Sequence, residues 1–329
     1  MRLTESLCNE CYKVIPATVN EVDGSMWINK RCPTHGVFTA MVERDSFWYY
    51  ICRRLNCKNI YNGYLIDITN RCNLKCKYCY NNNDGSQMSV DDVVNDAEEN
   101  KHRVPFIMMG GEPTLHDGLP EILKRLTGIA ETFVITNGIK LCDENYLNEI
   151  CASGLLKGNK LNVGLSFHLE SKGKDIEFLE LCRKRKFVIN TALYVIDGLE
   201  QIDIATSLAR KYSDVIPNMR IKAASNLGNE SGASNKIFVS DMINYLKRRG
   251  NTDLALSQFN KLSFGNVIHE GLFLMLVSWY DTNNVDLLDI SCPPFYRSKD
   301  GGIYNIVISE LINEGIRKGK IQTRIGGTT

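Results

Sequence analysis

Three cysteines that lie close together in the chain, Cys72, Cys76 and Cys79, could carry the chemistry of this protein. They are spaced Cys-x3-Cys-x2-Cys on one short loop, with the aromatic Tyr78 just before the third cysteine. Thiolates are the ligands that iron–sulfur clusters require, and three of them can leave one iron of a four-iron cluster open for a ligand. A structural zinc site is less consistent with this loop, because such sites normally use four ligands arranged as pairs.

The cysteine loop directly follows a predicted strand, and beyond it the chain alternates apolar strands with amphipathic helices. Such alternation is typical of βα units that build a parallel sheet. The predicted strands cover residues 64–69, 105–109, 131–136, 161–167, 187–195 and 218–224. Helix-compatible spacing falls between them, for example over residues 89–101, 117–127, 174–185 and 198–212. Six βα units predict an α/β fold with a partial, TIM-like (βα)6 barrel that is open rather than closed by eight strands.

A second motif, Gly110-Gly111-Glu112-Pro113, stands one βα unit after the cysteines, at the end of the second predicted strand. Two glycines would let the backbone approach a ligand, and the carboxylate could bind the ammonium group of an amino acid. Polar residues also occur on the later strands, and side chains at the C-terminal ends of barrel strands point into the mouth of the site. These further candidates are Thr136, Asn137, Ser166, His168 and Asn190.

The cysteine loop and the Gly-Gly-Glu-Pro stretch resemble the signature of the radical S-adenosylmethionine (SAM) superfamily, and the match continues through most of residues 64–225. The resemblance implies that Cys72, Cys76 and Cys79 ligate a four-iron four-sulfur (4Fe-4S) cluster whose open iron chelates SAM. An electron from the reduced cluster would then cleave SAM to a 5′-deoxyadenosyl radical. The electron would come from a reductant such as flavodoxin or ferredoxin.

The same resemblance assigns the other candidates to SAM. The motif from Gly110 to Pro113 would bind the methionine amino group, and Tyr78 would pack by the adenine. Ser166 would bind the ribose hydroxyls or the carboxylate. The remaining cofactor-binding candidates are Thr136, Asn137, His168 and Asn190. His168 could instead be a structural hydrogen-bonding residue, as lone histidines near strand ends often are.

Residues 1–60 are rich in cysteine and show little helical periodicity, which predicts a small metal-binding module. Cys8 and Cys11 form one pair of ligands, and Cys32 and His35 form a second. Two pairs of sulfur and nitrogen ligands suit tetrahedral zinc, or one iron in a rubredoxin-like site. Because a segment this small has little apolar surface, we expect the metal to contribute directly to its folding.

Two further cysteines leave alternatives open for this module. Cys52 or Cys57 could replace His35 as the fourth ligand, or the two could hold a further cluster together with a distant residue such as Cys292. A Cys-x2-Cys pair followed by Cys-Pro-x-His-Gly, ahead of a radical SAM barrel, resembles the tetraether lipid synthase and pterin-methylating branch of the superfamily. The resemblance supports a zinc-ribbon or rubredoxin-like module before the barrel.

Composition bounds the remaining possibilities. Of the 329 residues, 43% are hydrophobic, which supports a well-buried core, and a net charge of +1 gives no field that would attract nucleic acid. No signal peptide or transmembrane segment is evident, so we expect a cytoplasmic protein whose twelve cysteines are reduced. Residues 61–235 are predicted to form the barrel core, and residues 236–329 a C-terminal extension that covers it.

These observations predict a radical SAM enzyme that abstracts a hydrogen from an unactivated carbon of a small-molecule or lipid-like substrate. A C–C or C–S bond, or a methyl transfer, would follow. One alternative is a peptide maturase, although the sequence shows neither the winged-helix pattern nor the cysteine-rich C-terminal pattern common in such enzymes. Another alternative is a non-enzymatic zinc-binding protein. The basic runs at 183–186 and 247–249 are interpreted as solvated helix ends rather than as a nucleic-acid surface.

Overall fold

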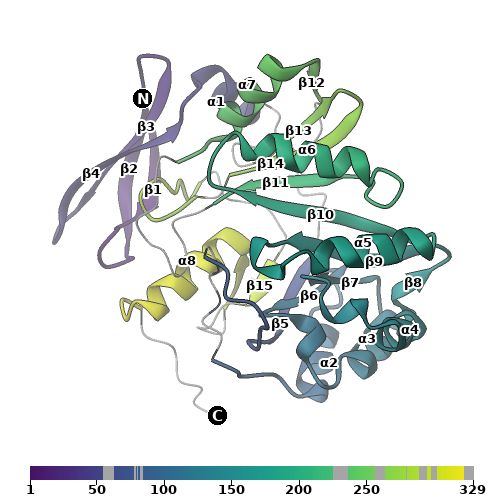
Figure 1. Ribbon diagram of the computed structural model, residues 1–329. Helices are drawn as coiled ribbons and strands as arrows, with labels where there is room; N and C mark the ends of the chain where they lie inside the picture. The colour runs from purple at the N-terminus through teal and green to yellow at the C-terminus, as the bar shows by residue number, and fades with distance from the viewer. Residues whose placement is uncertain are drawn as a thin grey trace, which may run out of the picture.

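The computed structural model describes residues 1–54, 63–77, 79, 81, 84–224, 236–255, 264–278, 280–288, 295–297 and 302–321. The chain forms a small antiparallel sheet at its N-terminus and a large mixed sheet with helices packed against it (Figure 1). Within the described ranges, no helix has the length and apolarity needed to span a membrane.

The N-terminal sheet is an antiparallel meander in which each strand pairs with the next. Asp23 and Gly24 form the two-residue turn between its second and third strands, and both have positive φ, which an Asp-Gly pair adopts readily. A helix follows the sheet, which corrects the expectation of little helical structure in this module. Its first turn is capped by Asp45, which accepts hydrogen bonds from the N–H groups of Phe47 and Trp48. The elements are β1 (Arg2–Leu7), β2 (Val14–Val22), β3 (Ser25–Cys32), β4 (Gly36–Glu43) and α1 (Ser46–Arg54).

Six parallel strands form the centre of the large sheet, in the order β11-β10-β9-β7-β6-β5. They are β5 (Tyr64–Thr69), β6 (Phe106–Gly110), β7 (Thr132–Thr136), β9 (Lys160–Phe167), β10 (Val188–Ile196) and β11 (Met219–Ala223). The connecting helices are α2 (Val90–Glu99), α3 (Leu119–Thr127), α4 (Glu144–Ile150), α5 (Lys174–Lys184) and α6 (Gln201–Lys211). Shorter elements are η1 (Pro113–Leu115), η2 (Lys140–Cys142), η3 (Cys151–Leu155), β8 (Leu156–Lys157) and η4 (Leu169–Ser171). The predicted α/β class with a parallel sheet is confirmed, and the arrangement is consistent with a partial TIM-like barrel.

Helices cover the outer face of this sheet. On β9, the alternating residues Leu161, Val163 and Leu165 are fully buried, and they share one hydrophobic core with helix residues such as Ile122 and Phe178. Successive side chains of a strand point to opposite faces of a sheet. The residues between these three therefore face the inside of the barrel.

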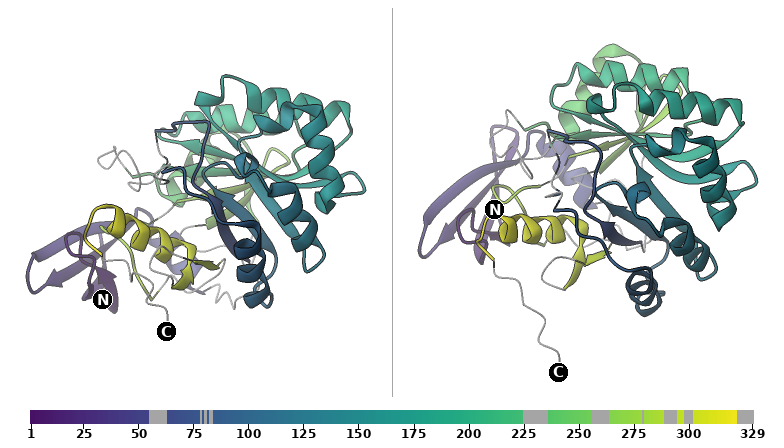
Figure 2. Two further views of the ribbon diagram at one scale, coloured as in Figure 1. Left: turned by 90° about the horizontal axis from the view of Figure 1, so that it is seen from below. Right: turned by 60° about the horizontal axis from the view of Figure 1, so that its bottom comes forward.

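Segments after residue 235 extend the large sheet at both edges. β14 pairs in parallel with β11, and β15 pairs in parallel with β5. In the described part of the chain, the strands follow one open path from β12 to β16. Helix α8 lies between the N-terminal sheet and the β5 edge (Figures 1 and 2). The elements are α7 (Val239–Arg249), β12 (Thr252–Leu254), β13 (Phe264–His269), β14 (Leu272–Val277), β15 (Phe295–Arg297), β16 (Ile303–Asn305) and α8 (Ile306–Arg317).

The N-terminal sheet shares a hydrophobic core with the barrel. Ile28, Val42 and Trp48 belong to the same buried cluster as the residues under the barrel helices. A separate, small cluster lies at the end of the sheet that carries the metal-ligand pairs, and it consists of Cys8, Ile15 and Cys32. Apolar packing therefore stabilises most of this sheet. A metal bound by the ligand pairs would act on the loops around this small cluster, and its direct contribution to folding stays a prediction.

Candidate functional site

The three cysteines of the predicted cluster loop follow the C-terminal end of β5, and each is partly exposed. The backbone N–H of Cys79 donates to the carbonyl oxygen of Cys76 at 3.2 Å. Burial raises the pKa of all three thiols, and the charge of a neighbouring cysteine raises the pKa of Cys72 and Cys76 further. A group of thiols releases protons when it binds a metal, and this donor set fits an iron–sulfur cluster. Tyr78 lies outside the described residues.

The two glycines of the second motif pack against the backbone that leads into the cysteine loop. A Cβ atom at Gly110 would overlap the carbonyl oxygen of Thr69, and one at Gly111 would overlap that of Arg71. The N–H of Gly111 donates to the Thr69 carbonyl oxygen at 2.7 Å, and that of Glu112 donates to the Arg71 oxygen at 2.8 Å. The sequence analysis explains Gly110 and Gly111 by a close approach of the backbone to a ligand. The structure shows that their own chain already requires them, since no side chain fits there.

Glu112 is 1% exposed, and both of its carboxylate oxygens are occupied by protein donors. Oε1 accepts hydrogen bonds from the Thr114 N–H at 3.1 Å, the Thr114 hydroxyl at 2.5 Å and the Thr136 hydroxyl at 2.6 Å. Oε2 accepts from the Asn137 N–H at 2.7 Å. Burial raises the pKa of Glu112, and these hydrogen bonds partly offset the increase. Oε2 accepts only this one hydrogen bond, so it is the oxygen with acceptor capacity left for an ammonium group.

Asn137 connects this buried network to the cysteine loop. Its side-chain Nδ2 donates to Oδ1 of Asn73, the residue after Cys72, at 2.8 Å. Its Oδ1 accepts from the N–H of Ile139 at 3.1 Å, which fixes the side-chain orientation. The Thr136 hydroxyl both donates to Glu112 and accepts from the Gly138 N–H at 3.0 Å. Thr136 and Asn137 are therefore brought to the site as supports for the cysteine loop.

The structure places His168 directly beside the cysteine loop. Its Nδ1 lies 3.3 Å from Sγ of Cys76, and its backbone N–H donates to Asp175 at 3.2 Å. Burial lowers the pKa of His168. Glu170 completes a group with Cys76 and His168 whose ligand atoms all lie within 4.8 Å of one another. The sequence analysis did not identify Glu170, because a single glutamate in a short turn after a strand has no distinctive local pattern.

The remaining candidates are separated along the barrel. Ser166 stands near the C-terminal end of β9, is 9% exposed, and makes no hydrogen bond through its hydroxyl within the described residues. Asn190 is the third residue of β10 and so lies near the N-terminal end of that strand. Its position therefore differs from the others, which occupy the C-terminal ends of their strands.

Two charged residues that the sequence analysis missed also approach the cysteines. Lys222 lies on β11, and burial lowers its pKa to about 8, although the negative charges of Glu310 and Cys79 act to raise it. Glu310, on α8, is 3% exposed. An isolated lysine in a strand and a glutamate in a distant helix give no sequence signal, because only the fold brings them together.

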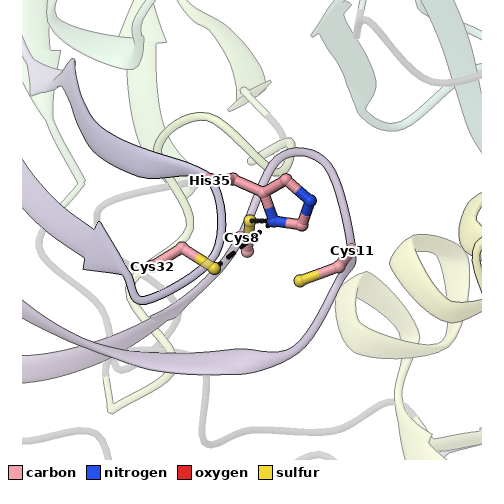
Figure 3. A group of neighbouring side chains, drawn as sticks. All are labelled: Cys8, Cys11, Cys32 and His35. Carbon is pink, nitrogen blue, oxygen red and sulfur yellow. Dashed lines mark hydrogen bonds between the residues drawn. The ribbon is translucent and has the colours of Figure 1, made fainter.

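The predicted ligands of the N-terminal module converge on one point (Figure 3). Ligand atoms of Cys8, Cys11, Cys32 and His35 all lie within 4.8 Å of one another. Nδ1 of His35 is 3.4 Å from Sγ of Cys32 and 3.6 Å from Sγ of Cys8. Burial acts to raise the pKa of Cys32, but hydrogen bonds from the backbone of Thr34 and His35 lower it overall. Three thiols and one imidazole at this spacing suit a tetrahedral zinc ion.

Among the described residues, His35 rather than Cys52 is the fourth member of the ligand group with Cys8, Cys11 and Cys32. Cys52 lies on α1 and packs in the main hydrophobic core, where it is 8% exposed, so it is not part of the group that contains His35. Cys57 and Cys292, the other residues considered for a further cluster, lie outside the described residues.

Comparison with known families identifies two domains in this chain. Residues 66–209 match the radical SAM superfamily, and residues 1–44 match the HMPTM N-terminal zinc ribbon domain. The chain therefore contains a radical SAM domain and an N-terminal zinc ribbon domain. These assignments agree with the cysteine spacing and with the two pairs of ligands in the N-terminal module.

Among curated relatives, the chain is similar to the 7,8-dihydro-6-hydroxymethylpterin dimethyltransferase of Methanocaldococcus jannaschii. The two are 32% identical over 231 residues, which is 56% of this chain and 45% of the relative. A probable GTP 3′,8-cyclase of Archaeoglobus fulgidus is 35% identical over 105 residues, or 30% of this chain and 34% of that protein. The chain thus spans less than half the length of these curated relatives.

Among solved structures, Streptococcus suis SuiB bound to the precursor peptide SuiA aligns with a TM-score of 0.47 at 16% identity. The alignment covers 62% of this chain and 48% of that chain.

Proposed function

We propose that Cys72, Cys76 and Cys79 hold a 4Fe-4S cluster at which SAM is reductively cleaved. The bound cluster would supply one electron for cleavage of SAM to a 5′-deoxyadenosyl radical. The radical would abstract a hydrogen from an unactivated carbon of a small molecule, leading to a C–C or C–S bond or to methylation. The observation that carries this proposal is the grouping of three thiols at the C-terminal end of β5, beside the 110–113 segment. That edge is where barrel enzymes place their chemistry.

The residues around the cysteine loop would position it rather than react. Glu112 binds Thr136 and Asn137, and Asn137 in turn binds Asn73 inside the loop. This chain of hydrogen bonds would hold the cysteines and the 110–113 segment in one geometry, so that the segment can receive the methionine end of SAM. The Ser166 hydroxyl, which has no partner in the described protein, would be available to the ribose or carboxylate of SAM.

The N-terminal ligand group would hold one zinc ion, with iron as the alternative metal. Tyr12, one residue after Cys11, contacts α8, because a Cβ atom at Gly315 would lie 2.9 Å from its ring. The zinc ribbon would therefore help to position α8, which carries Glu310 near Cys79. A reductant such as flavodoxin or ferredoxin would supply the electron. A peptide substrate and a purely structural zinc protein remain the alternatives, and no contact described above favours either.

Anaerobic reconstitution followed by single-turnover cleavage tests the proposal. The wild-type protein should bind about four irons at the loop and should release 5′-deoxyadenosine from SAM under a strong reductant. Cys76→Ala should lose both properties. Cys151→Ala, which removes a partly exposed thiol outside the loop, is the matched control and should keep both. A colourless protein that binds only zinc would overturn the proposal.

A further inference from the structure

His168 stands where a barrel strand meets the cysteine loop. It follows Phe167, the last residue of β9, and its side chain is partly buried. Its Nδ1 lies 3.3 Å from Sγ of Cys76, although the two residues are 92 positions apart in the chain. A cysteine sulfur accepts hydrogen bonds, and at this separation the ring nitrogen and the sulfur are in direct contact. The fold has thus brought one imidazole to one of the three proposed cluster ligands.

The main chain of His168 is held on both sides, which restricts where its ring can lie. Its backbone N–H donates to Oδ2 of Asp175 at 3.2 Å, and its carbonyl oxygen accepts from the N–H of Ser171 at 3.0 Å. Asp175 is buried in the first turn of α5, and its Oδ1 accepts from the N–H of Ile176 at 2.8 Å. His168 is therefore presented to Cys76 by a strand end that is tied to the following helix.

The cysteine loop is tied to the same turn. The N–H of Lys77 donates to Oε1 of Glu170 at 3.3 Å, and Glu170 lies two residues after His168. Within the loop, the N–H of Cys79 donates to the carbonyl oxygen of Cys76 at 3.2 Å. Both members of the pair are thus fixed through the main chain. The contact between Nδ1 and Sγ is a consequence of the fold rather than of one side-chain rotamer.

Metal binding at Cys76 decides which of the two atoms donates. A free thiol can donate its proton to an unprotonated Nδ1, whereas an iron-bound thiolate has no proton and can only accept. The contact with a ligated Cys76 therefore requires a proton on Nδ1. The imidazolium and one neutral tautomer both carry that proton, so the donation does not depend on the charge of the ring. Nε2 has no protein partner among the described residues, so no contact of Nε2 with them imposes the opposite tautomer.

The donor at Cys76 is a side chain, which a substitution can remove. The contacts described for the other two sulfurs involve the main chain. Sγ of Cys72 accepts from the N–H of Leu74 at 3.4 Å, and Sγ of Cys79 lies 3.8 Å from the carbonyl oxygen of Asn81. Main-chain groups stay in place when a side chain is changed. A change at His168 therefore alters the surroundings of one ligand sulfur and leaves these contacts in place.

We propose that His168 is a positioning residue that donates a hydrogen bond from Nδ1 to the Cys76 thiolate and thereby raises the reduction potential of the cluster. The inference rests on the cluster proposed above, and it assigns His168 to a cluster ligand rather than to SAM. Reduction adds a negative charge to the cluster. A donor at a ligand sulfur stabilises that charge more than it stabilises the oxidised state, so a weaker reductant can supply the electron.

Redox titration of the reconstituted full chain without SAM, followed by electron paramagnetic resonance, tests the proposal. His168→Leu removes the donor and should lower the one-electron reduction equilibrium constant about tenfold, which corresponds to a midpoint potential about 59 mV lower. Asparagine places an NH2 group near the position of Nδ1, so His168→Asn should stay within about threefold of wild type. His102→Leu changes an exposed histidine between α2 and β6, at the opposite edge of the sheet from the cysteines. It is the matched control and should leave the potential unchanged.

A spectroscopic measurement on the wild type keeps the test independent of whether a variant assembles its cluster. The protein is prepared with histidine that carries the heavy nitrogen isotope, and the reduced cluster is compared with that of unlabelled protein. A weak magnetic coupling between the cluster and a nitrogen should change with the isotope, because the N–H of His168 contacts a ligand sulfur. The absence of any histidine coupling would overturn the proposal even where His168→Leu does not bind iron.

The outcomes separate this inference from the function on which it rests. A wild type that binds no four-iron cluster or does not cleave SAM would remove the proposed function itself. A wild type that does both, with an unchanged potential in His168→Leu, would overturn the inference alone. If that variant instead lost SAM affinity at an unchanged potential, the histidine would be a contact of SAM. Loss of iron from both His168→Leu and His168→Asn would show that the ring is needed for cluster assembly, which would also contradict the proposal.

Discussion

Replacing Glu112 by glutamine should weaken the fold as well as SAM binding. Glutamine keeps one oxygen, which can retain the three donors now bound to Oε1. Its NH2 group would then take the place of Oε2 and face the N–H of Asn137, where the present distance is 2.7 Å. One charge-assisted hydrogen bond is lost, and two donors are left opposite each other. Part of this loss is offset because a buried charge, whose pKa burial raises, is also removed.

A charge-assisted hydrogen bond contributes about 1.5 to 3 kcal/mol, so the free energy of unfolding should fall by about 2 kcal/mol. Asn137 would then move, and its hydrogen bond to Asn73, now 2.8 Å long, would weaken. The cysteine loop would be held less firmly as a result. We therefore expect weaker SAM binding with an unchanged iron content. Urea denaturation monitored by circular dichroism gives the stability, and calorimetry under argon gives the affinity.

The matched control for this prediction is Glu121→Gln, which changes an exposed carboxylate in the first turn of α3. It should alter stability by less than about 0.5 kcal/mol and leave SAM affinity unchanged. The reasoning would be refuted if Glu112→Gln lost SAM affinity at full stability. That result would indicate that the carboxylate binds the ammonium group directly and that its network with Thr136 and Asn137 contributes little.

Three further predictions follow from the same structure. Removing Cys8 and Cys11 together should open the ligand loops, which limited proteolysis would detect as new cleavage near residues 8–13 and 32–36. Most of the N-terminal sheet should stay protected because it shares the main hydrophobic core, and cleavage throughout residues 1–54 would contradict this prediction. Glu43 is 1% exposed, and burial is the main reason that its pKa is raised to about 7. Because the folded state holds this proton more tightly than the unfolded state, the free energy of unfolding should fall as pH rises from about 4.5 to about 7. Glu43→Gln keeps the single oxygen that accepts from Arg44, Asp45 and Ser240, so it should remove this pH dependence and give a higher urea midpoint than wild type at pH 8; equal slopes in both proteins would argue against it. Chelation of the N-terminal metal at neutral pH should lower the thermal midpoint only modestly, and a complete loss of the fold would show that the ribbon depends on its metal.

The positions of the strands could be predicted because their signal is local. Each central strand is a short, mostly apolar run, and the pattern predicts each within a residue or two of its place. The ligand pairs of the zinc ribbon were likewise readable, because zinc requires a fixed set of residue types at short spacing. Helix α1 was missed because its Phe-Trp-Tyr-Tyr run has strand-like propensity. It is helical because Asp45 caps it and Trp48 is buried against the elements around Gly265.

The sequence alone determined which chemistry this chain can support: three thiols suited to a cluster, paired ligands suited to a metal with the fourth ligand left open, and six βα units to present them. Only the tertiary structure decided what surrounds those groups. It turned Glu112 inward onto Thr136 and Asn137, brought His168 to Cys76, and gave the Asn162 amide no hydrogen-bond partner among the described residues. These outcomes depend on contacts between residues far apart in the chain. A linear pattern records the type and spacing of residues, but it does not record which distant donor or charge will stand beside them.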